Sequence, residues 1–373
     1  MTKQPSYRFV RYTEAWEQRK LGEVAQYRNG KAHENCIDEN GKYIVVNSKF
    51  ISTDGEVKKF SNKKNEALFE NEIAFVLSDV PNGRAIARTF WVEKNDKYTL
   101  NQRIAGITPI GETFPYFLYI LMNRHPYFLA FDDGAKQTNL SVSDVMGFEA
   151  YYPKYSEQQK IGAYFRNLDH LITLQQRKLE VLKEQKKTYL KLLFSTKGQT
   201  KPALRFAGFE DEWKEVKLGE IIQSISSKNY ITEYYEEGNN PVIQQGDIPI
   251  VGFSDNKPFN NFSNVILFGD HTLSLFKPET PFLLATDGIK ILHSDLTTQP
   301  FLFIMLERYL PKSQGYKRHY SLLKNELSSL PSLPEQEVIG SFFQDLDKAI
   351  AKQEEKVNQL KESKQTLLRK MFI

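Results

Sequence analysis

Two short motifs in this 373-residue chain have the residue types of a metal-dependent nuclease. Glu56-x-Lys58 and Glu215-x-Lys217 each place a carboxylate two residues before a lysine, as in the Glu-x-Lys half of a site for phosphodiester hydrolysis. Charged residues make up 26% of the chain, so triplets of this kind arise freely by chance. We therefore interpret both as ordinary surface sequence.

Other catalytic motifs are missing from the sequence. A methyltransferase is expected to carry an Asn/Asp-Pro-Pro-aromatic loop, and the chain has no Pro-Pro dipeptide. It also lacks the Gly-x4-Gly-Lys-Ser/Thr phosphate loop of nucleotide-binding enzymes. His271 and His293 are too isolated for tetrahedral metal-ligand spacing, and the single cysteine, Cys36, cannot form an internal disulfide or a paired thiolate site. We expect no catalytic residue, no metal site and no bound cofactor in this chain.

The chain contains one pattern twice. The matching blocks are Arg8–Trp16 with Arg205–Trp213, Lys20–Glu23 with Lys217–Glu220, Pro115–Pro126 with Pro300–Pro311, and Glu157–Gly162 with Glu335–Gly340. Between these blocks the two copies differ. A repeat with a fixed frame and a divergent interior predicts one scaffold that carries two different binding surfaces. Trp16 and Trp213 could stack on bases, but they lie in the matching frame, so we predict that both pack in cores.

Each copy ends in a long heptad pattern. The a and d positions are Ile161, Leu168, Gln175, Leu182, Tyr189, Phe165, Ile172, Leu179, Lys186 and Leu193 in the first copy, and Ile339, Leu346, Gln353, Leu360, Leu367, Phe343, Ile350, Val357, Lys364 and Met371 in the second. More than four heptads predict coiled-coil helices, and the polar exceptions occur at matching places, where they can set register and orientation. The first helix is expected to begin with a capping box of Ser156 and Gln159, and the second with Pro334.

The order of the segments predicts the architecture. Residues 196–333 follow the first long helix and precede the second, and compact domains usually keep their termini close, so the two helices should be antiparallel. The predicted fold class is α+β. Two globular mixed α/β domains, residues 1–155 and 196–333, are separated by two spacer helices, residues 156–195 and 334–373, in a pseudo-twofold internal repeat. The expected strands are Tyr43–Val46, Ile73–Leu77, Arg103–Ile110, Val265–Phe268 and Ile289–Leu292.

Composition limits the environment of the protein. Hydrophobic residues make up 40% and aromatic residues 13%, enough for real cores and too much for a disordered chain. The net charge of +4 is compatible with a polyanionic partner without requiring one. The N-terminal residues lack a signal core, and no apolar run approaches the roughly 20 residues of a membrane span. Together with a single cysteine, these features predict a cytoplasmic protein.

The doubled arrangement resembles the specificity subunits of type I restriction-modification systems over essentially the whole chain. The residues that carry the resemblance are the frame blocks above together with Gly83-Arg84, Leu100–Gln102, Gln137–Ser141, Gly269–His271 and Gly315–Tyr320. The resemblance implies a non-catalytic DNA-binding subunit with two target-recognition domains. It also implies that two adenine methyltransferase subunits and restriction subunits are directed by this chain to a bipartite site in double-stranded DNA. S-adenosylmethionine, ATP and Mg²⁺ would then belong to the partner subunits.

Candidate DNA-contacting residues lie where the two copies differ. Arg, Lys, Gln and Asn side chains can pair with base edges or phosphates. The candidates are Arg84, Arg88, Arg103, Lys136, Gln137, Thr138 and Asn139 in the first copy, and Lys290, Gln314, Tyr316, Lys317, Arg318 and His319 in the second. The first set is followed by a possible capping box of Ser141 and Asp144. The alternative interpretation is a solvated polar loop in each copy.

Two other functional classes remain open at this point. A stand-alone nuclease or methyltransferase is disfavoured by the missing motifs. A coiled-coil interaction protein that does not contact DNA would share the helices and the repeat. Salt-sensitive DNA binding would distinguish a DNA-reading subunit from such a protein, because release of counterions from phosphates makes binding depend steeply on salt.

Overall fold

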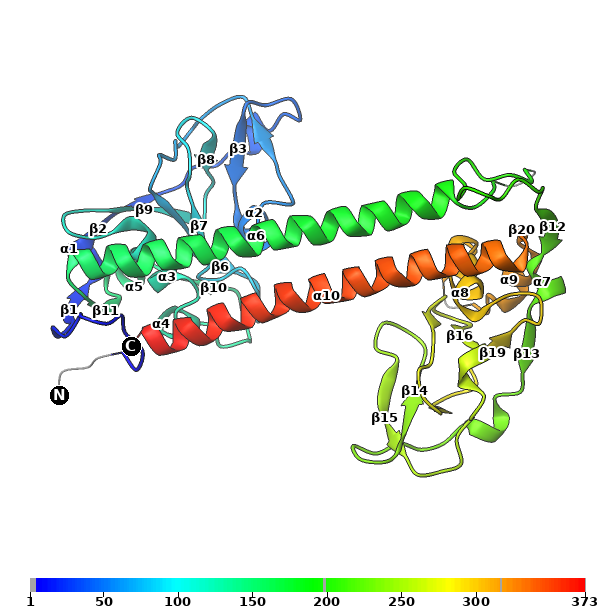
Figure 1. Ribbon diagram of the computed structural model, residues 1–373. Helices are drawn as coiled ribbons and strands as arrows, with labels where there is room; N and C mark the ends of the chain where they lie inside the picture. The colour runs from blue at the N-terminus through cyan, green and yellow to red at the C-terminus, as the bar shows by residue number, and fades with distance from the viewer. Residues whose placement is uncertain (1–4, 197–198, 316, 373) are drawn as a thin grey trace. The chain divides into compact units, whose positions relative to one another are not determined.

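The computed structural model describes residues 5–196, 199–315 and 317–372 (Figure 1). The chain forms two compact units. Unit 1 contains the residues up to Leu174 and those from Val357 onward, and unit 2 contains Gln175–Lys356. The two long helices, α6 (Tyr155–Leu192) and α10 (Leu333–Met371), each contribute one half to unit 1 and the other half to unit 2.

In its described residues, unit 1 is built from a four-stranded sheet, a three-stranded sheet, two two-stranded sheets and short helices. Its strands are β1 (Glu17–Lys20), β2 (Ala25–Asn29), β3 (Tyr43–Val46), β4 (Phe60–Ser61), β5 (Ile73–Val76), β6 (Ser78–Asp79), β7 (Thr89–Trp91), β8 (Tyr98–Leu100), β9 (Ile104–Pro109), β10 (Thr138–Asn139) and β11 (Glu149–Tyr152). Its short helices are α1 (Leu21–Val24), α2 (Ser48–Ser52), α3 (Pro115–Met122), α4 (Pro126–Leu129) and α5 (Val142–Met146), with a 3-10 turn at Glu34–Cys36. The larger sheet has the order β2-β9-β5-β7, and the smaller has the order β4-β3-β8 with β3 and β8 parallel.

Unit 2 repeats this plan. Its strands are β12 (Lys214–Lys217), β13 (Gln223–Ile225), β14 (Asn240–Ile243), β15 (Ile250–Ser254), β16 (Ile266–Gly269), β17 (Leu275–Phe276), β18 (Leu283–Leu284), β19 (Ile289–His293) and β20 (Leu327–Leu330). Its shorter helices are α7 (Leu218–Ile221), α8 (Gln299–Arg308) and α9 (Tyr320–Asn325), with 3-10 turns at Lys228–Tyr230 and Phe262–Asn264. The order β13-β19-β16-β17 matches the larger sheet of unit 1, and β15-β14-β18, with β14 and β18 parallel, matches the smaller one. The two sequence copies therefore fold into the same topology.

A buried ion pair joins the first residues of each copy to the start of a long helix. In unit 1, Arg8 donates from Nε and Nη2 to the two carboxylate oxygens of Glu157 at 2.7 and 2.6 Å. In unit 2, Arg205 makes the same bidentate contact with Glu335 at 2.7 Å for both bonds. Each carboxylate side chain is only 1% exposed. The hydrogen bonds to these carboxylates raise the pKa of both arginines, so each guanidinium stays charged.

The glutamine that follows each buried glutamate holds the helix start against the globular part of its unit. Gln158 accepts a hydrogen bond from the Phe114 backbone N–H at 2.9 Å and donates to the carbonyl of Pro153 at 2.9 Å. Gln336 accepts from the Thr298 N–H at 3.2 Å and donates to the Pro331 carbonyl at 3.0 Å. The Glu-Gln pair is therefore a frame element because both residues are buried and hydrogen-bonded.

Within each unit, the end of one long helix packs beside the start of the other. In unit 1, the Phe372 ring lies 5.5 Å from that of Phe117 and 6.1 Å from that of Phe165 near the start of α6. In unit 2, Phe194 lies 5.6 Å from Phe301 and 6.3 Å from Phe343 near the start of α10. The two helices are thus antiparallel within each unit, as predicted. Each of these aromatic contacts adds buried apolar surface to the core of its unit.

The polar residues of the heptad seam find polar partners. Lys186 binds Asp347 of α10 and Glu307 of α8, both at 2.8 Å. Burial alone would lower the pKa of Lys186, but hydrogen bonds to both carboxylates raise it, so the ammonium stays charged. Lys364 binds Asp169 at 2.5 Å, and Gln353 donates to the side-chain oxygen of Gln175 at 2.9 Å. These contacts exist in one register only, which fits the predicted role of the seam's polar residues in setting it.

The predicted α+β class and the five predicted strands are confirmed; Tyr43–Val46 has the predicted ends, and the ends of the other four differ by at most one residue. Trp16 and Trp213 are buried in the cores, as predicted. The capping box at Ser156 is wrong: α6 begins at Tyr155, so Ser156 lies inside the first turn, and the Lys154 carbonyl accepts the first helical N–H bonds. The predicted cap is not used because the buried pair Glu157-Gln158 positions the start of α6.

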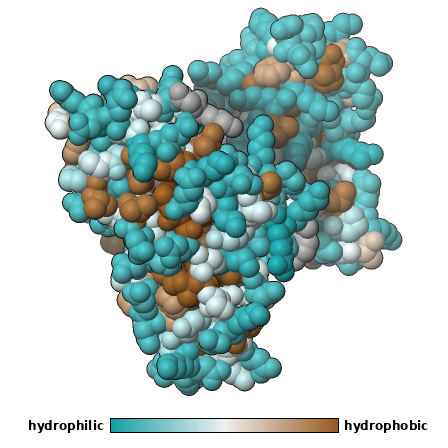
Figure 2. All heavy atoms as spheres, turned by 90° about the vertical axis from the view of Figure 1, so that its right-hand side faces the viewer, coloured by the Kyte–Doolittle hydropathy of each residue, from teal (hydrophilic) through white to brown (hydrophobic). Residues whose placement is uncertain are grey.

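The surface of the molecule is mixed. Figure 2 shows one face on which hydrophobic residues form patches among a largely hydrophilic surface. In the part of the chain that the structure describes, no helix combines the length and the apolar character needed to span a bilayer.

The buried carboxylate of unit 2 gives a first testable prediction. Glu335→Gln removes the charge that pairs with Arg205, which is only partly solvated, and should lower the free energy of unfolding by about 3 kcal/mol. The matched control is Glu337→Gln, an exposed neighbour on the same helix, which should change stability by less than about 0.5 kcal/mol. Urea denaturation followed by circular dichroism measures both. Equal effects of the two substitutions would contradict the anchoring role of Glu335.

Candidate nucleic-acid interface

Three separate segments of unit 1 meet beside its larger sheet. β6 pairs with β10, so that Ser78 lies opposite Asn139. The backbone continues this ladder on both sides: Leu140 N–H donates to the Leu77 carbonyl at 2.8 Å, and Leu77 N–H donates to the Arg103 carbonyl at 3.0 Å. The candidates Arg103, Lys136, Gln137 and Asn139, which lie far apart in sequence, are thereby brought to one surface.

The side chains on this surface differ in exposure. Lys136, Gln137, Asn139 and Arg103 are exposed, whereas Thr138 is buried. Gln137 donates from Nε2 to Ser78 Oγ at 2.7 Å and to Asn139 Oδ1 at 3.3 Å, so its amide is held in place. These two bonds use both N–H hydrogens of the amide, so its carbonyl oxygen is the group left to accept a hydrogen bond from a donor on a base edge.

Thr138 and Arg103 differ from the other candidates in burial and in backbone conformation. Thr138 donates to Asp132 Oδ1 at 3.1 Å and is buried, so its place fits a structural role better than the predicted DNA contact. Arg103 has φ 65°, a left-handed conformation that is uncommon for a residue with a side chain. The predicted capping box at Ser141 and Asp144 is confirmed at the start of α5.

A second group of basic side chains lies on the loop after β6. The Asp79 carboxylate accepts hydrogen bonds from the N–H groups of Ala85 and Ile86 at 2.6 and 3.0 Å, which folds this loop around it. Gly83 is required here, because a Cβ would come within 2.1 Å of an Asp79 carboxylate oxygen. The loop presents Arg84 and Arg88.

Arg124, which the sequence did not single out, joins this group. Its Nη1 donates to the Arg84 carbonyl at 3.0 Å, and Arg88 Nε donates to the same oxygen at 2.8 Å. The pKa of Arg124 is lowered, mainly by burial and secondly by the positive charge of the nearby Arg88. The one signal in the sequence was the polar break Asn123–His125 between two apolar helical segments.

In unit 2 the corresponding segments converge in the same way. His319 N–H donates to the Asp270 carbonyl at 2.8 Å, and Asp270 N–H donates to the Gly288 carbonyl at 2.8 Å. Asp270 therefore links His319 to Gly288, and the neighbouring side chains of Arg318 and Asp287 lie 3.7 Å apart. The structure also brings Gln245 here, since its Oε1 accepts from His271 N–H at 3.1 Å. Sequence analysis missed it because it lies just after β14, far from these segments in the sequence.

His319 does not fit the predicted DNA contact. Its side chain is fully buried. Its Nε2 accepts a hydrogen bond from the Gln314 N–H at 3.0 Å, and its Nδ1 lies 3.0 Å from the Asp270 carbonyl oxygen. The Asp270 carboxylate in turn accepts from the backbone N–H groups of His319 and Tyr320 at 2.8 and 2.7 Å. The polar pair replaces the two leucines, Leu77 and Leu140, that meet at this place in unit 1. The imidazole is a structural element of the loop.

The remaining candidates of unit 2 stay accessible to different degrees. Gln314, Lys317 and Arg318 are exposed, and Lys290 on β19 is half-buried. Arg318 lies 3.7 Å from Asp287, with both side chains more than 60% exposed, so this ion pair is weak and leaves the guanidinium available. Tyr316 lies outside the described residues.

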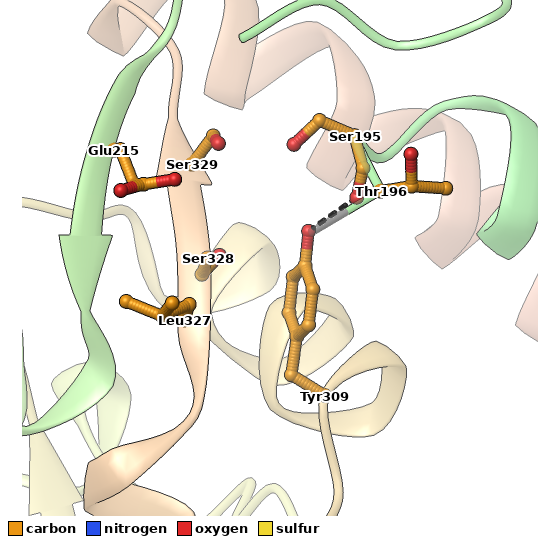
Figure 3. A pocket seen from close by; sticks show the side chains of 7 residues that line it. All are labelled: Ser195, Thr196, Glu215, Tyr309, Leu327, Ser328 and Ser329. Atoms are coloured by element: carbon orange, nitrogen blue, oxygen red, sulfur yellow. Dashed lines mark hydrogen bonds between the residues drawn. The ribbon is translucent and has the colours of Figure 1, made fainter. Parts of the chain in front are cut away.

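The Glu-x-Lys triplets do not form part of a clustered acidic site. Glu56 and Lys58 are exposed on a loop, and Glu215 lines a small polar pocket beside β12 and β20. Figure 3 shows that pocket, where the Tyr309 hydroxyl donates to the Ser195 carbonyl at 2.9 Å. Glu215 is the one carboxylate among its lining residues. Among residues 5–196, 199–315 and 317–372, no three His, Cys, Asp or Glu side chains are grouped as metal ligands.

Comparison with known proteins agrees with this division into two similar halves. The family model described as the type I restriction modification DNA specificity domain matches residues 13–184 and 210–362. The chain therefore belongs to this family. A type I restriction enzyme specificity subunit, MjaVIII, of Methanocaldococcus jannaschii is 23% identical over 96% of this chain and 92% of its own length. The chain is accordingly a DNA specificity subunit rather than the catalyst of its system.

Two solved structures share the fold. The S subunit of a type I restriction-modification system from M. genitalium is 19% identical, with a TM-score of 0.69 over 100% of this chain and 99% of that one. A structure described for complex assembly and conformational transition of the type I R-M system is also 19% identical, with a TM-score of 0.52 over 97% of this chain and 98% of that one. At this identity the likeness concerns the fold.

The buried carboxylate of the second surface gives a testable prediction. Asp270→Ala leaves the Tyr320 N–H without its acceptor, while the His319 N–H keeps its bond to the Asp270 carbonyl, and should lower the free energy of unfolding by about 2 kcal/mol. Asp270→Asn keeps one acceptor oxygen and should cost less. Arg318→Ala, on the same loop but exposed, is the control and should cost less than about 0.5 kcal/mol. Thermal unfolding measures all three, and an Asp270→Ala protein as stable as the control would refute this account of the loop.

Proposed function

We propose that the chain reads a bipartite site in double-stranded DNA, one half through each unit. The observation that supports this proposal is that the two units share the strand order of their main sheets but differ in the residues of the loops beside them. In unit 1, backbone hydrogen bonds join Leu77 after β5 to Arg103 before β9 and to Leu140 before α5. In unit 2, the same kind of ladder joins Asp270 after β16 to Gly288 before β19 and to His319 before α9. The frame of the ladder is shared, whereas the exposed side chains on it differ, as expected for two surfaces with different targets.

The first half of the site is assigned to the surface with Arg103, Lys136, Gln137 and Asn139. The amide of Gln137 is oriented by Ser78, which reduces the freedom that it loses on binding. The second half is assigned to Gln314, Lys317, Arg318 and Lys290. Lysine and arginine can contact phosphates, while arginine and amide side chains can also pair with base edges in the major groove.

Membership in the family supports a proposal about partner subunits. We assign to this chain two methyltransferase subunits that modify adenine with S-adenosylmethionine, and restriction subunits that use ATP and Mg²⁺. Support for partner subunits comes from the relative named as part of a restriction enzyme and from the fold shared with a structure described for type I complex assembly. We also propose a cytoplasmic location, which the single cysteine fits.

Exchange of one recognition segment tests the assignment of half-sites. Replacing residues 220–325 by the equivalent segment of a relative should change one half of the methylated motif and leave the other half intact, because each ladder is contained in one unit. Mapping methylated adenines across a genome, with the methyltransferase partner present, measures the outcome. The reciprocal exchange in unit 1 is the control. A change in both halves would show that the two units do not read DNA separately.

Arg318 tests the second surface at the level of one residue. If the guanidinium contacts a base edge, Arg318→Ala should reduce discrimination at one position of the second half-site by about 1 to 3 kcal/mol. If it contacts a phosphate, binding should weaken for all sequences and the salt slope should fall by about one. Lys312→Ala, exposed in the same segment, is the control. Unchanged discrimination and unchanged salt slope would return Arg318 to a solvated loop.

A further inference from the structure

We propose that Arg84, Arg88 and Arg124 of unit 1 form a binding site for a single phosphate of the DNA backbone, distinct from the base-reading ladder. This inference rests on the proposed function and names a ligand for a group of residues that the ladder does not use. Its starting observation is that two guanidinium groups, those of Arg88 and Arg124, donate to one carbonyl oxygen, that of Arg84. The exposed side chain of Arg84 extends from the same residue.

The local carboxylates compensate the charge of this cluster only in part. Asp79 and Asp132 attract Arg124 electrostatically, but their oxygens accept from the N–H groups of Ala85, Ile86 and Gly134 and from Thr138. Within the described residues, neither forms an ion pair with an arginine of the cluster. Asp54 lies 3.6 Å from Arg88 but is 90% exposed, so solvent screens most of its charge. The guanidinium groups of Arg88 and Arg124 meet at one carbonyl oxygen, and the exposed Arg84 side chain starts from the same residue. Such partly compensated cations attract an anion, and guanidinium groups match the geometry of phosphate oxygens.

The loop is held in a costly conformation that positions these cations. Asn82, Ala87 and Arg124 have φ of 53°, 57° and 51°, in the left-handed region that side chains disfavour. Two of them are joined directly, because Arg124 N–H donates to the Ala87 carbonyl at 2.8 Å. Backbone strain of this kind is retained where a site is arranged in advance for its ligand. Fixed donors then lose little freedom when phosphate binds.

In the described part of unit 2, the segments that correspond to this cluster lack its arginines. Its loop between β16 and β17, residues 270–274, contains neither arginine nor lysine. Aligning Pro115 with Pro300 places Tyr309 where unit 1 has Arg124, and the Tyr309 hydroxyl instead donates to the Ser195 carbonyl. The phosphate site therefore belongs to one half of the repeat. We infer that the backbone of the first half-site is held more strongly by charge than that of the second.

The test uses the complex of this chain with its methyltransferase partner and a DNA duplex that carries the mapped target. Arg84→Gln is the main variant because its side chain makes no hydrogen bond in the described structure, so the fold should be unaffected. It should weaken binding roughly ten- to a hundredfold and reduce the slope of log affinity against log salt by about 0.9. Arg124→Gln should do the same, with its thermal stability measured alongside. Arg177→Gln, an exposed arginine on α6, is the matched control and should leave both quantities nearly unchanged.

The phosphate that binds this cluster can be located by replacing single DNA phosphates with uncharged groups. Methylphosphonate groups placed one at a time through the first half-site should include one position that weakens binding by the wild-type complex but not by the Arg84→Gln complex. No such position is expected in the second half-site. Inorganic phosphate is tested separately by its effect on thermal stability.

The outcomes separate this inference from the proposed function. Sequence-specific binding by the wild type with an unchanged salt slope in both variants would overturn the phosphate site and leave the DNA-reading role standing. Stabilisation by inorganic phosphate, with no methylphosphonate effect in the first half-site, would also overturn it, because the cluster would then bind a free anion. Failure of the wild-type complex to bind its mapped target would contradict the proposed function itself.

Discussion

The buried carboxylates Glu157 and Glu335 determine how each copy of the repeat is put together. Each one receives a bidentate arginine from the beginning of its own copy, and lies at the start of a long helix at the end of that copy. A charge that is 1% exposed is tolerated only when its partner is in place. The ion pair thus joins the beginning of each copy to the start of the long helix at its end. The neighbouring glutamine adds hydrogen bonds to the backbone that leads into the globular part.

The helix seam depends on this closure. Once each helix start is anchored, the end of the other helix can enter the same core, as Phe372 does in unit 1 and Phe194 in unit 2. Apolar heptads alone allow several registers, because leucine packs against leucine in each of them. Lys186 and Lys364 together restrict that freedom, because in the observed register both of these largely buried ammonium groups bind a carboxylate of the facing helix.

The same frame permits the two recognition surfaces to diverge. Sheet order and helix anchors hold the ladder segments at fixed places, so exposed residues on them can change without loss of the fold. The Asp270 and His319 pair shows that even the base of a loop can change from apolar to polar when every buried donor and acceptor is satisfied. The arginine cluster shows a second kind of divergence, in which one unit has acquired charge that the other lacks.

The sequence by itself determined the repeat, the two long helices, the main strands and the absence of familiar catalytic motifs, because these depend on periodicity and residue type along the chain. It also pointed to Arg84, Arg103 and Arg318 as basic candidates. Only the tertiary structure decided which candidates share a surface, since Ser78, Arg103 and Asn139 meet through β-ladder bonds between distant segments. It alone placed His319 in the core and brought Arg124 to the loop of Arg84, because burial and side-chain neighbours are properties of long-range packing that local sequence does not record.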